Sequence, residues 1–177
     1  MLYLGTKEKK NLISDSTAST LILEADTTSL SYFMDYLNRA YSQHFAVYGI
    51  RGNKCASLSA LFDEWAAALQ FPFYFGENLN AFADCMGDLI RAHPTNHVIV
   101  VSNAGSLLTD DLDCLPEFFD VLSRVPDTWK QRYGPTQNHQ FKLILQDSSD
   151  KIVALRNQLQ QLAIDFDEIS GDWLALL

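Results

Sequence analysis

The chain has 177 residues, of which 47% are hydrophobic and 12% aromatic, so one domain with a sizeable buried core is expected. Lysine and arginine number 13 against 22 aspartates and glutamates, and the net charge of −9 makes nucleic acid an unfavourable ligand and a basic protein a favourable one. Because the sequence contains neither a run of 18 apolar residues nor a signal-peptide pattern, we expect a cytoplasmic protein without a membrane span.

The first 44 residues divide into a leader and one strand–helix unit. Residues 1–19 are polar and rich in serine and threonine after the first few positions, and no periodic pattern predicts order there. Thr20–Glu24 (TLILE) is a predicted strand, and the helix from Ser29 carries apolar residues at offsets 0, 3, 4, 7 and 11. Residues 20–44 therefore form an additional βα unit, which we expect to supply an edge strand and an outer helix.

Residues 45–147 form the predicted core domain, in which strands and helices alternate. The predicted strands are Phe45–Ile50, His97–Ser102 and Phe141–Gln146. Helices are expected to begin near Ser57, Asn78 and Leu112, with a break or kink of the last one at Pro126. Because a helix that joins two parallel strands nearly always makes a right-handed crossover, this order predicts a small parallel sheet packed with helices.

The stretch from Phe71 to Leu89, FPFYFGENLNAFADCMGDL, changes from an aromatic loop to a helix and contains no basic residue. Pro72 fixes the backbone, and Gly76 is expected to allow a sharp bend. Asn78 is a good N-cap candidate, and apolar residues recur after it at helical spacing on one face. The opposite face carries Asn80, Asp84 and Asp88. The outward surface of this segment is therefore polar and acidic, with aromatic side chains beside it.

Nine residues of this stretch form a recognisable set: Pro72, Tyr74, Gly76, Glu77, Asn78, Leu79, Ala81, Asp84 and Cys85. Together they resemble the signature of the barstar family, whose members are small intracellular proteins that inhibit secreted or injected bacterial ribonucleases by plugging the active site. A looser resemblance extends from Phe45 to Gln146 and leaves both termini uncovered. It implies a barstar-like α/β fold with three core strands, to which the strand at 20–24 adds a fourth at the edge.

The resemblance also implies which residues bind the ribonuclease. In the family, the loop tyrosine and the aspartates of the following helix enter the enzyme's site, which gives that role to Tyr74 and Asp84. The whole predicted binding surface is Tyr74, Phe75, Gly76, Asn78, Asn80, Ala83, Asp84 and Asp88. Asn80 and Ala83 stand where the best-known member has a contact aspartate and a tryptophan. A glutamate that adds a contact in the family matches Arg124 most nearly, with Asp120 and Asp127 as alternatives.

An acidic helix face also has a simpler explanation, which is that it is only a solvated surface. For Asp88 this simpler explanation is the stronger of the two. Glu77 is ambiguous in the same way, because the helix dipole and the free N–H groups of a first turn favour a carboxylate in any protein. The acids near Leu112 are explained likewise by the start of a helix. Only the whole set of matching residues makes Asp84 a stronger candidate for binding than an acid on an ordinary solvated helix face.

Residues 148–177 lie beyond the resemblance. Apolar residues at helical spacing from Ile152 to Leu162 predict a helix, and the tail AIDFDEISGDWLALL mixes large apolar residues with acids. Exposure of Trp173 and its neighbours would create an apolar patch, so the tail either docks on the core or forms a protein interface. We expect the helix and the tail to pack on the core.

No pattern of metal ligands or catalytic residues stands out. The three cysteines are odd in number and lack CxxC spacing, which suits a reducing compartment and argues against a disulfide framework or a zinc site. His93 and His97 are separated by Pro94 at a helix-to-strand junction, so they do not share a helical face. Walker, GxGxxG and GxSxG motifs are missing, and an Asp84–Glu77 carboxylate pair lacks a sugar platform. We expect no enzyme activity, no metal and no cofactor.

These observations lead to two hypotheses of different classes. The first is an immunity protein or antitoxin that binds a small basic bacterial ribonuclease and blocks its active site with the acidic loop and helix. It has no nucleic-acid, membrane or small-molecule partner. The alternative is an acidic protein–protein adaptor that keeps the barstar fold and has no ribonuclease target. Co-purification separates the two hypotheses, since only the first predicts a small basic nuclease.

Overall fold

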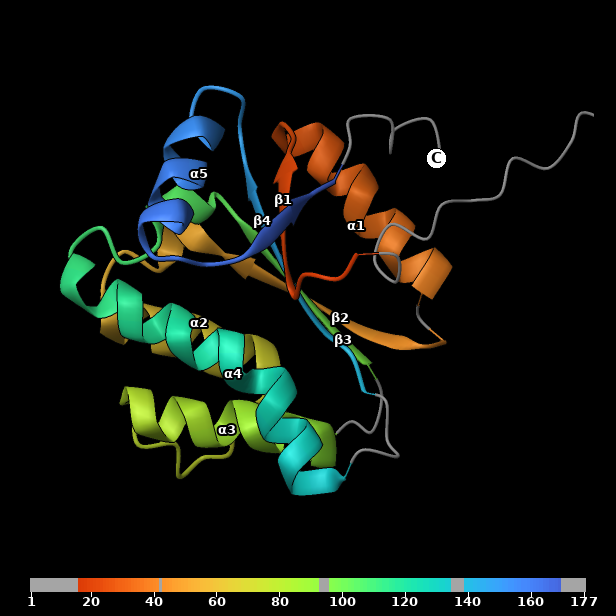
Figure 1. Ribbon diagram of the computed structural model, residues 1–177, viewed down its shortest axis with the longest axis vertical. Helices are drawn as coiled ribbons and strands as arrows, with labels where there is room; N and C mark the ends of the chain where they lie inside the picture. The colour runs from red at the N-terminus through yellow and green to blue at the C-terminus, as the bar shows by residue number, and fades with distance from the viewer. Residues whose placement is uncertain (1–15, 42, 93–95, 135–138, 170–177) are drawn as a thin grey trace, which may run out of the picture.

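Strands and helices alternate along the chain in the computed structural model, which describes residues 16–41, 43–92, 96–134 and 139–169 (Figure 1). The strands are β1 Thr20–Glu24, β2 Phe45–Arg51, β3 Asn96–Ser102, β4 Phe141–Asp147 and β5 Phe166–Glu168. The α-helices are α1 Thr27–Tyr41, α2 Leu58–Leu69, α3 Leu79–Ala92, α4 Leu115–Tyr133 and α5 Ile152–Gln161. The four strands that the sequence predicts are confirmed, with ends that differ by at most one residue.

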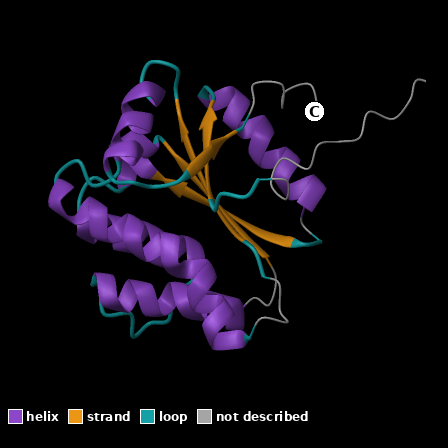
Figure 2. Ribbon diagram, in the orientation of Figure 1, coloured by secondary structure: helices purple, strands orange, loops and turns teal. Residues whose placement is uncertain are grey.

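All five strands belong to one parallel sheet with the order β2-β3-β4-β1-β5. The register places Tyr48 of β2 beside Ile99 of β3, and Ile99 beside Leu143 of β4. Figure 2 shows this sheet running between helices on its two sides. The central strands β3 and β4 are almost entirely buried, and their middle parts, Val98–Val101 and Leu143–Leu145, are continuously apolar, as expected for strands that are covered on both faces.

Alternate side chains of the strands feed two hydrophobic clusters, one on each face of the sheet. On the first face, Val98 and Val100 of β3 pack with residues of α1 such as Phe33. On the second face, Ile99 and Val101 join the apolar sides of α2, α3, α4 and α5. The fold is therefore a three-layer α/β arrangement in which, among the helices of the described residues, only α1 covers its side of the sheet (Figure 1).

The strand count and the place of β1 differ from the sequence-based prediction. The sheet has five strands instead of three or four, and β1 lies between β4 and β5 instead of at the edge. The edge position belongs to β5, which pairs with β1 through Thr20–Ile22. The sequence of β5, Phe-Asp-Glu, is short and acidic, so it has no strand pattern of its own, and only its partner β1 makes it a strand.

Helix α4 continues through Pro126 as one helix of 19 residues, so of the predicted break or kink the break is absent, and the ribbon of α4 changes direction along its length (Figure 1). Proline removes one backbone donor from a helix. Burial on both sides of Pro126 compensates for the lost backbone hydrogen bond. Leu122 and Val125 precede Pro126 and Trp129 follows it, and each of the three is 2% exposed. Helix α4 is thus packed against the core on both sides of Pro126.

The two ends of the chain are only partly described. Of the predicted leader, residues 1–15 lie outside the described residues, whereas Ala18 is buried and its carbonyl accepts a hydrogen bond from Nζ of Lys142 at 2.6 Å. The predicted C-terminal helix is confirmed as α5. Ile169 is buried beside β1, with its N–H donating to the carbonyl of Ile22, and Trp173 lies outside the described residues.

The three cysteines, which are free thiols, differ in burial and give a prediction. Cys55 is fully buried and burial raises the pKa of its thiol to about 12, while Cys85 and Cys114 are half-buried. Because the thiolate is the reactive form, Cys55 of the native protein is expected to resist a thiol reagent at pH 8 and to react only on unfolding. Reagent counting should give three thiols in denaturant without reductant. Immediate labelling of Cys55 in the folded protein would contradict the buried position.

Candidate functional site

The aromatic loop between α2 and α3 is anchored by two of its rings. Phe71 and Phe75 contact each other, with ring centroids 5.2 Å apart, and Phe75 lies 5.5 Å from Phe62 of α2. The N–H of Phe75 also donates to the carbonyl of Pro72 at 2.9 Å, which closes a turn. Phe75, a predicted contact residue, is therefore half-buried and holds the loop in place; its direct role in binding stays a prediction.

Two other rings of the loop face solvent. Tyr74 is 75% exposed, and Phe73 is fully exposed with its ring centroid 5.6 Å from that of Tyr74. Phe73 is a candidate contact residue that sequence reasoning missed. The sequence shows that a loop with four aromatic residues cannot bury all of them at one corner, but only the folded chain decides which rings point outward.

The bend before α3 is taken at Glu77 and not at Gly76. Glu77 has a φ of 47°, in the left-handed region, whereas Gly76 is not among the residues with positive φ. The prediction that Gly76 provides the unusual backbone conformation is therefore wrong in its position. The side-chain amide of Asn78 donates to the carbonyl of Gly76 at 2.9 Å, which holds the exposed Glu77 between two bonded residues.

Asn78 is confirmed as the residue that caps α3. Its Oδ1 accepts a hydrogen bond from the N–H of Ala81 at 2.9 Å, and its carbonyl accepts one from the N–H of Phe82. A side-chain acceptor at this position satisfies an N–H group that the helix itself leaves without a partner. The cap therefore fixes the residue at which α3 begins, and with it the side of the helix on which the acidic residues lie.

Replacement of Asn78 by alanine is expected to lower the free energy of unfolding by about 1 kcal/mol, because the N–H of Ala81 loses its acceptor. Urea unfolding followed by circular dichroism measures this change. Asn78→Asp is the matched control, since it keeps the acceptor oxygen and should retain most of the stability. Equal destabilisation by both variants would contradict the capping role.

The two faces of α3 follow the predicted pattern. Phe82 and Met86 are fully buried, and the ring of Phe82 lies 5.4 Å from that of Trp65 in α2 and 5.6 Å from that of Phe118 in α4. Asn80, Asp84 and Asp88 are exposed on the other side, and Ala83 is partly buried at the margin. We call Asn80, Asp84 and Asp88 the acidic face of α3.

Helix α4 brings a cation to the acidic face that the local sequence does not contain. Arg132 places Nη1 3.0 Å from Oδ1 of Asp88 and Nη2 3.4 Å from Oδ1 of Asp84. The hydroxyl of Tyr133 donates to the same oxygen of Asp88 at 3.2 Å. The absence of basic residues from 71–89 thus holds for the segment but not for the folded surface.

Gly87 leaves room for the guanidinium of Arg132 against α3. A Cβ at this position would lie 2.7 Å from Nη1 of Arg132, which is closer than real side-chain contacts allow. The indole N–H of Trp129 donates to the carbonyl of Met86 at 2.9 Å, so α4 is bonded to α3 one residue away from Gly87. Arg132 is therefore held close against α3 by the packing of two helices.

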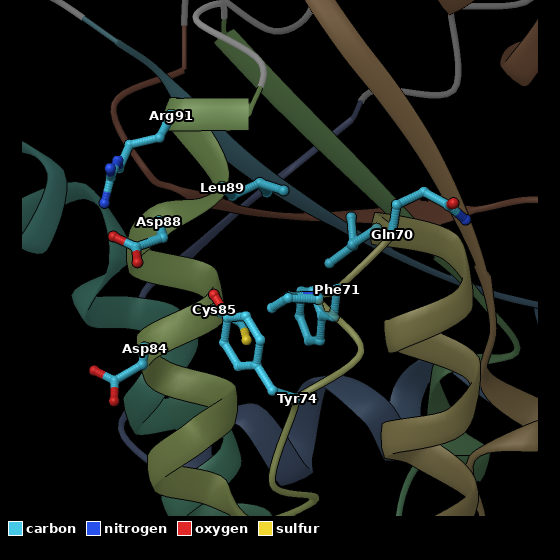
Figure 3. A pocket seen from close by; sticks show the side chains of 10 residues that line it. Gln70, Phe71, Tyr74, Asp84, Cys85, Asp88, Leu89 and Arg91 are labelled. Carbon is cyan, nitrogen blue, oxygen red and sulfur yellow. The ribbon is translucent and has the colours of Figure 1, made fainter.

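A groove with a volume of about 490 Å³ lies between the aromatic loop and α3. It is lined by Leu69, Gln70, Phe71, Pro72, Tyr74, Asp84, Cys85, Asp88, Leu89 and Arg91. In Figure 3, Tyr74 leans from the loop toward Cys85 of α3, while the carboxylates of Asp84 and Asp88 point to the other side of the helix. Burial, and then the neighbouring Asp84 and Asp88, raise the pKa of the Cys85 thiol, so this thiol is a poor nucleophile.

The remaining candidate contacts lie on α4. Arg124 forms an ion pair with Asp120 one turn earlier on its own helix, at 2.5 Å between Nη2 and Oδ2. This pair does not join the acidic face, whose contacts with α4 come from Arg132 and Tyr133 instead. A ribonuclease contact through Asp120 or Asp127 stays a prediction.

The described residues contain neither a cluster of metal ligands nor a helix that could span a membrane. No group of three or more histidine, cysteine, aspartate or glutamate side chains in 16–41, 43–92, 96–134 and 139–169 is arranged to hold a metal ion. Within the same ranges, none of the helices combines the length and the apolar composition that crossing a bilayer requires. The exposed loop and the acidic face of α3 remain the candidate functional site.

Comparison with known families identifies residues 45–146 as a match to the family described as Barstar (barnase inhibitor). The match covers more than half of the chain and includes the aromatic loop and all of α3. Its three strands, β2, β3 and β4, are neighbours in the sheet, and the strands outside the match, β1 and β5, extend the sheet beyond β4. No curated protein matches the chain.

Solved structures with a similar fold come from much longer proteins. Cdc6p of Pyrobaculum aerophilum is 15% identical with a TM-score of 0.58, and the match covers 90% of this chain and 41% of that one. For the ORC2 protein of Aeropyrum pernix in its ADPNP-ADP complexes, the identity is 11%, the TM-score 0.57 and the coverage 86% and 41%. For Drosophila ORC bound to GC-rich DNA and Cdc6, the identity is 12% and the TM-score 0.54, and the match covers 93% of this chain and 27% of that one.

This chain spans less than half of the length of each of these proteins. At such low identity the likeness shows the fold alone, that is, a parallel α/β sheet in a similar arrangement.

Proposed function

The chain belongs to the barstar family, and we propose that it is an intracellular inhibitor of a bacterial ribonuclease, acting by binding and not by catalysis. The observation that carries the proposal is the placement of Tyr74 and Asp84. Both residues match the family's motif, and both are exposed on neighbouring elements, Tyr74 at 75% and the Asp84 side chain at 76%. The partner would be a small basic ribonuclease, and the protein would serve as an immunity protein or antitoxin.

The chemistry of this surface supports the proposal. A ribonuclease binds the phosphates of RNA with cations, so carboxylates that stand where phosphates would bind can occupy the same groups. The net charge of −9 favours approach of a basic enzyme, and segment 55–90 contains five acids and no base. Phe73 and Tyr74 add exposed aromatic area, the kind of contact that often anchors an interface.

A second candidate function is the adaptor, in which the same surface binds a different protein. Asn80 and Ala83, which replace a carboxylate and a tryptophan of the best-known member, favour a changed target. Arg132 favours it as well, because it offsets part of the negative charge of the acidic face. Both candidates use the aromatic loop and the acidic face of α3, and they differ in what binds there.

Affinity purification with the tagged protein separates the two candidates. The inhibitor predicts recovery of a small basic protein whose ribonuclease activity is suppressed in the complex and returns after dissociation. It also predicts an association rate that falls steeply as salt rises. Recovery of a large assembly without latent ribonuclease activity, together with no inhibition of barnase, would favour the adaptor.

A further inference from the structure

Arg132 is an unusual feature of a surface proposed to bind a cationic enzyme. Its guanidinium bridges two carboxylates of α3, Asp88 at 3.0 Å and Asp84 at 3.4 Å, and it comes from a different helix. The pair of aspartates therefore presents a local charge of about −1 instead of −2 to an approaching partner. The segment that carries the family motif does not contain this counter-charge, because Arg132 lies on α4.

Arg132 is less exposed than the carboxylates that it contacts. Its side chain is 38% exposed, against 51% for Asp88 and 76% for Asp84. It packs over Gly87, and the hydroxyl of the next residue, Tyr133, donates to Asp88 at 3.2 Å and lies 3.4 Å from the carbonyl oxygen of Gly87. A partner that binds Asp84 therefore meets Arg132 beside it, and a guanidinium that moved away would lose both of these contacts.

The sign of the effect follows from these exposures. An exposed ion pair holds its partner only weakly, so Arg132 contributes little by orienting Asp84. A cation of the partner that binds Asp84 lies well within the screening length of about 8 Å from Arg132, and the two like charges repel. The repulsion between Arg132 and the partner's cation therefore outweighs any benefit from orienting Asp84.

We propose that Arg132 masks Asp84 and Asp88 in the unbound protein and is a specificity-determining residue of the binding surface. It discriminates against weakly basic partners and selects those whose site presents several cations to the acidic face. The masking itself is a property of this chain, whereas the selection among ribonucleases rests on the proposed function.

The test compares Arg132→Gln with Arg124→Gln. Both variants remove one positive charge from α4, but Arg124 is paired with Asp120 on its own helix, so only Arg132→Gln removes the counter-charge of the two aspartates of α3. Arg132→Lys keeps the charge and serves as the rescue. Two probes are used: hexa-arginine, titrated while the backbone amide signals of residues 79–92 are followed by NMR, and barnase, followed by association rate and Kd.

Arg132→Gln is expected to bind hexa-arginine at α3 about twofold to fivefold more tightly than the parent, while Arg124→Gln and Arg132→Lys remain close to the parent. Barnase should show the same order, mainly in the association rate. Equal gains for Arg132→Gln and Arg124→Gln, or weaker binding by Arg132→Gln, would overturn the masking. If the peptide separates the variants but none of them binds barnase, the masking stands and the proposed selection among barnase-like ribonucleases is wrong.

Discussion

Replacement of Asp84 by alanine is expected to weaken inhibition of the cognate ribonuclease by about 2 to 5 kcal/mol, or about 30-fold to several thousandfold in Kd. Complexes of barnase and barstar are among the established examples of this range. Asp84 occupies the middle of the acidic face, one turn after Asn80 and one turn before Asp88, and its side chain is 76% exposed and available to a partner.

The physical reason is the cost of a buried charge without a partner. When Asp84 is covered by the enzyme, its carboxylate accepts charge-assisted hydrogen bonds from arginine or lysine. The alanine variant leaves those cations desolvated and unpaired, and this penalty exceeds that of losing an acid at the rim. Because Asn80 is neutral, Asp84 and Tyr74 should carry a larger share of the affinity, with Asp88 compensating from the next turn.

The measurement is inhibition by Asp84→Ala, with Tyr74→Ala and Asp88→Ala as companions and circular dichroism to confirm that each variant is folded. Asp35→Ala is the matched control. Asp35 is an exposed acid paired with Arg39 at 2.7 Å, and it lies on α1, across the sheet from α3. If Asp84→Ala inhibits as well as the parent, the acidic face of α3 is not the binding surface and the adaptor becomes the better interpretation.

Replacement of Trp129 by alanine is expected to lower the free energy of unfolding by about 3 to 5 kcal/mol. The indole is 2% exposed, its ring lies 5.7 Å from that of Phe141 in β4, and its N–H donates to the carbonyl of Met86. The alanine variant creates a cavity between α4 and the sheet and also breaks the bond between α4 and α3. Because that bond helps to place Arg132 against the acidic face, its loss should also reduce the masking of Asp84 and Asp88 in the molecules that remain folded.

Trp129→Phe separates packing from hydrogen bonding. It keeps an aromatic ring in the core but loses the donor to Met86, so it should cost clearly less than Trp129→Ala, about 1 to 3 kcal/mol. Urea unfolding monitored by circular dichroism gives both values. A loss below 1 kcal/mol for Trp129→Ala would mean that α4 does not depend on this residue for its attachment to the sheet and to α3.

Local patterns in the sequence were sufficient for strands β1 to β4, for the presence of the five helices and for the faces of α3. Strand runs such as Thr20–Glu24 and the cap at Asn78 depend on residues close in the chain, so the sequence predicted them within a residue or two. The helical spacing likewise separated the buried Phe82 from the exposed Asp84. The family motif added a function for that exposed face, which periodicity alone does not contain.

Contacts between distant residues were decided only by the tertiary structure. The position of β1 inside the sheet depends on β5, a strand that is stabilised by its partner and not by its own three residues. The charge of the acidic face depends on Arg132, which is 44 residues away from Asp88 in the chain. The exposure of Phe73 in place of Phe71 or Phe75 depends on which rings find room against α2 and α3. In each case the deciding energy is a pairing or packing term between separate elements, and a local pattern carries no information about it.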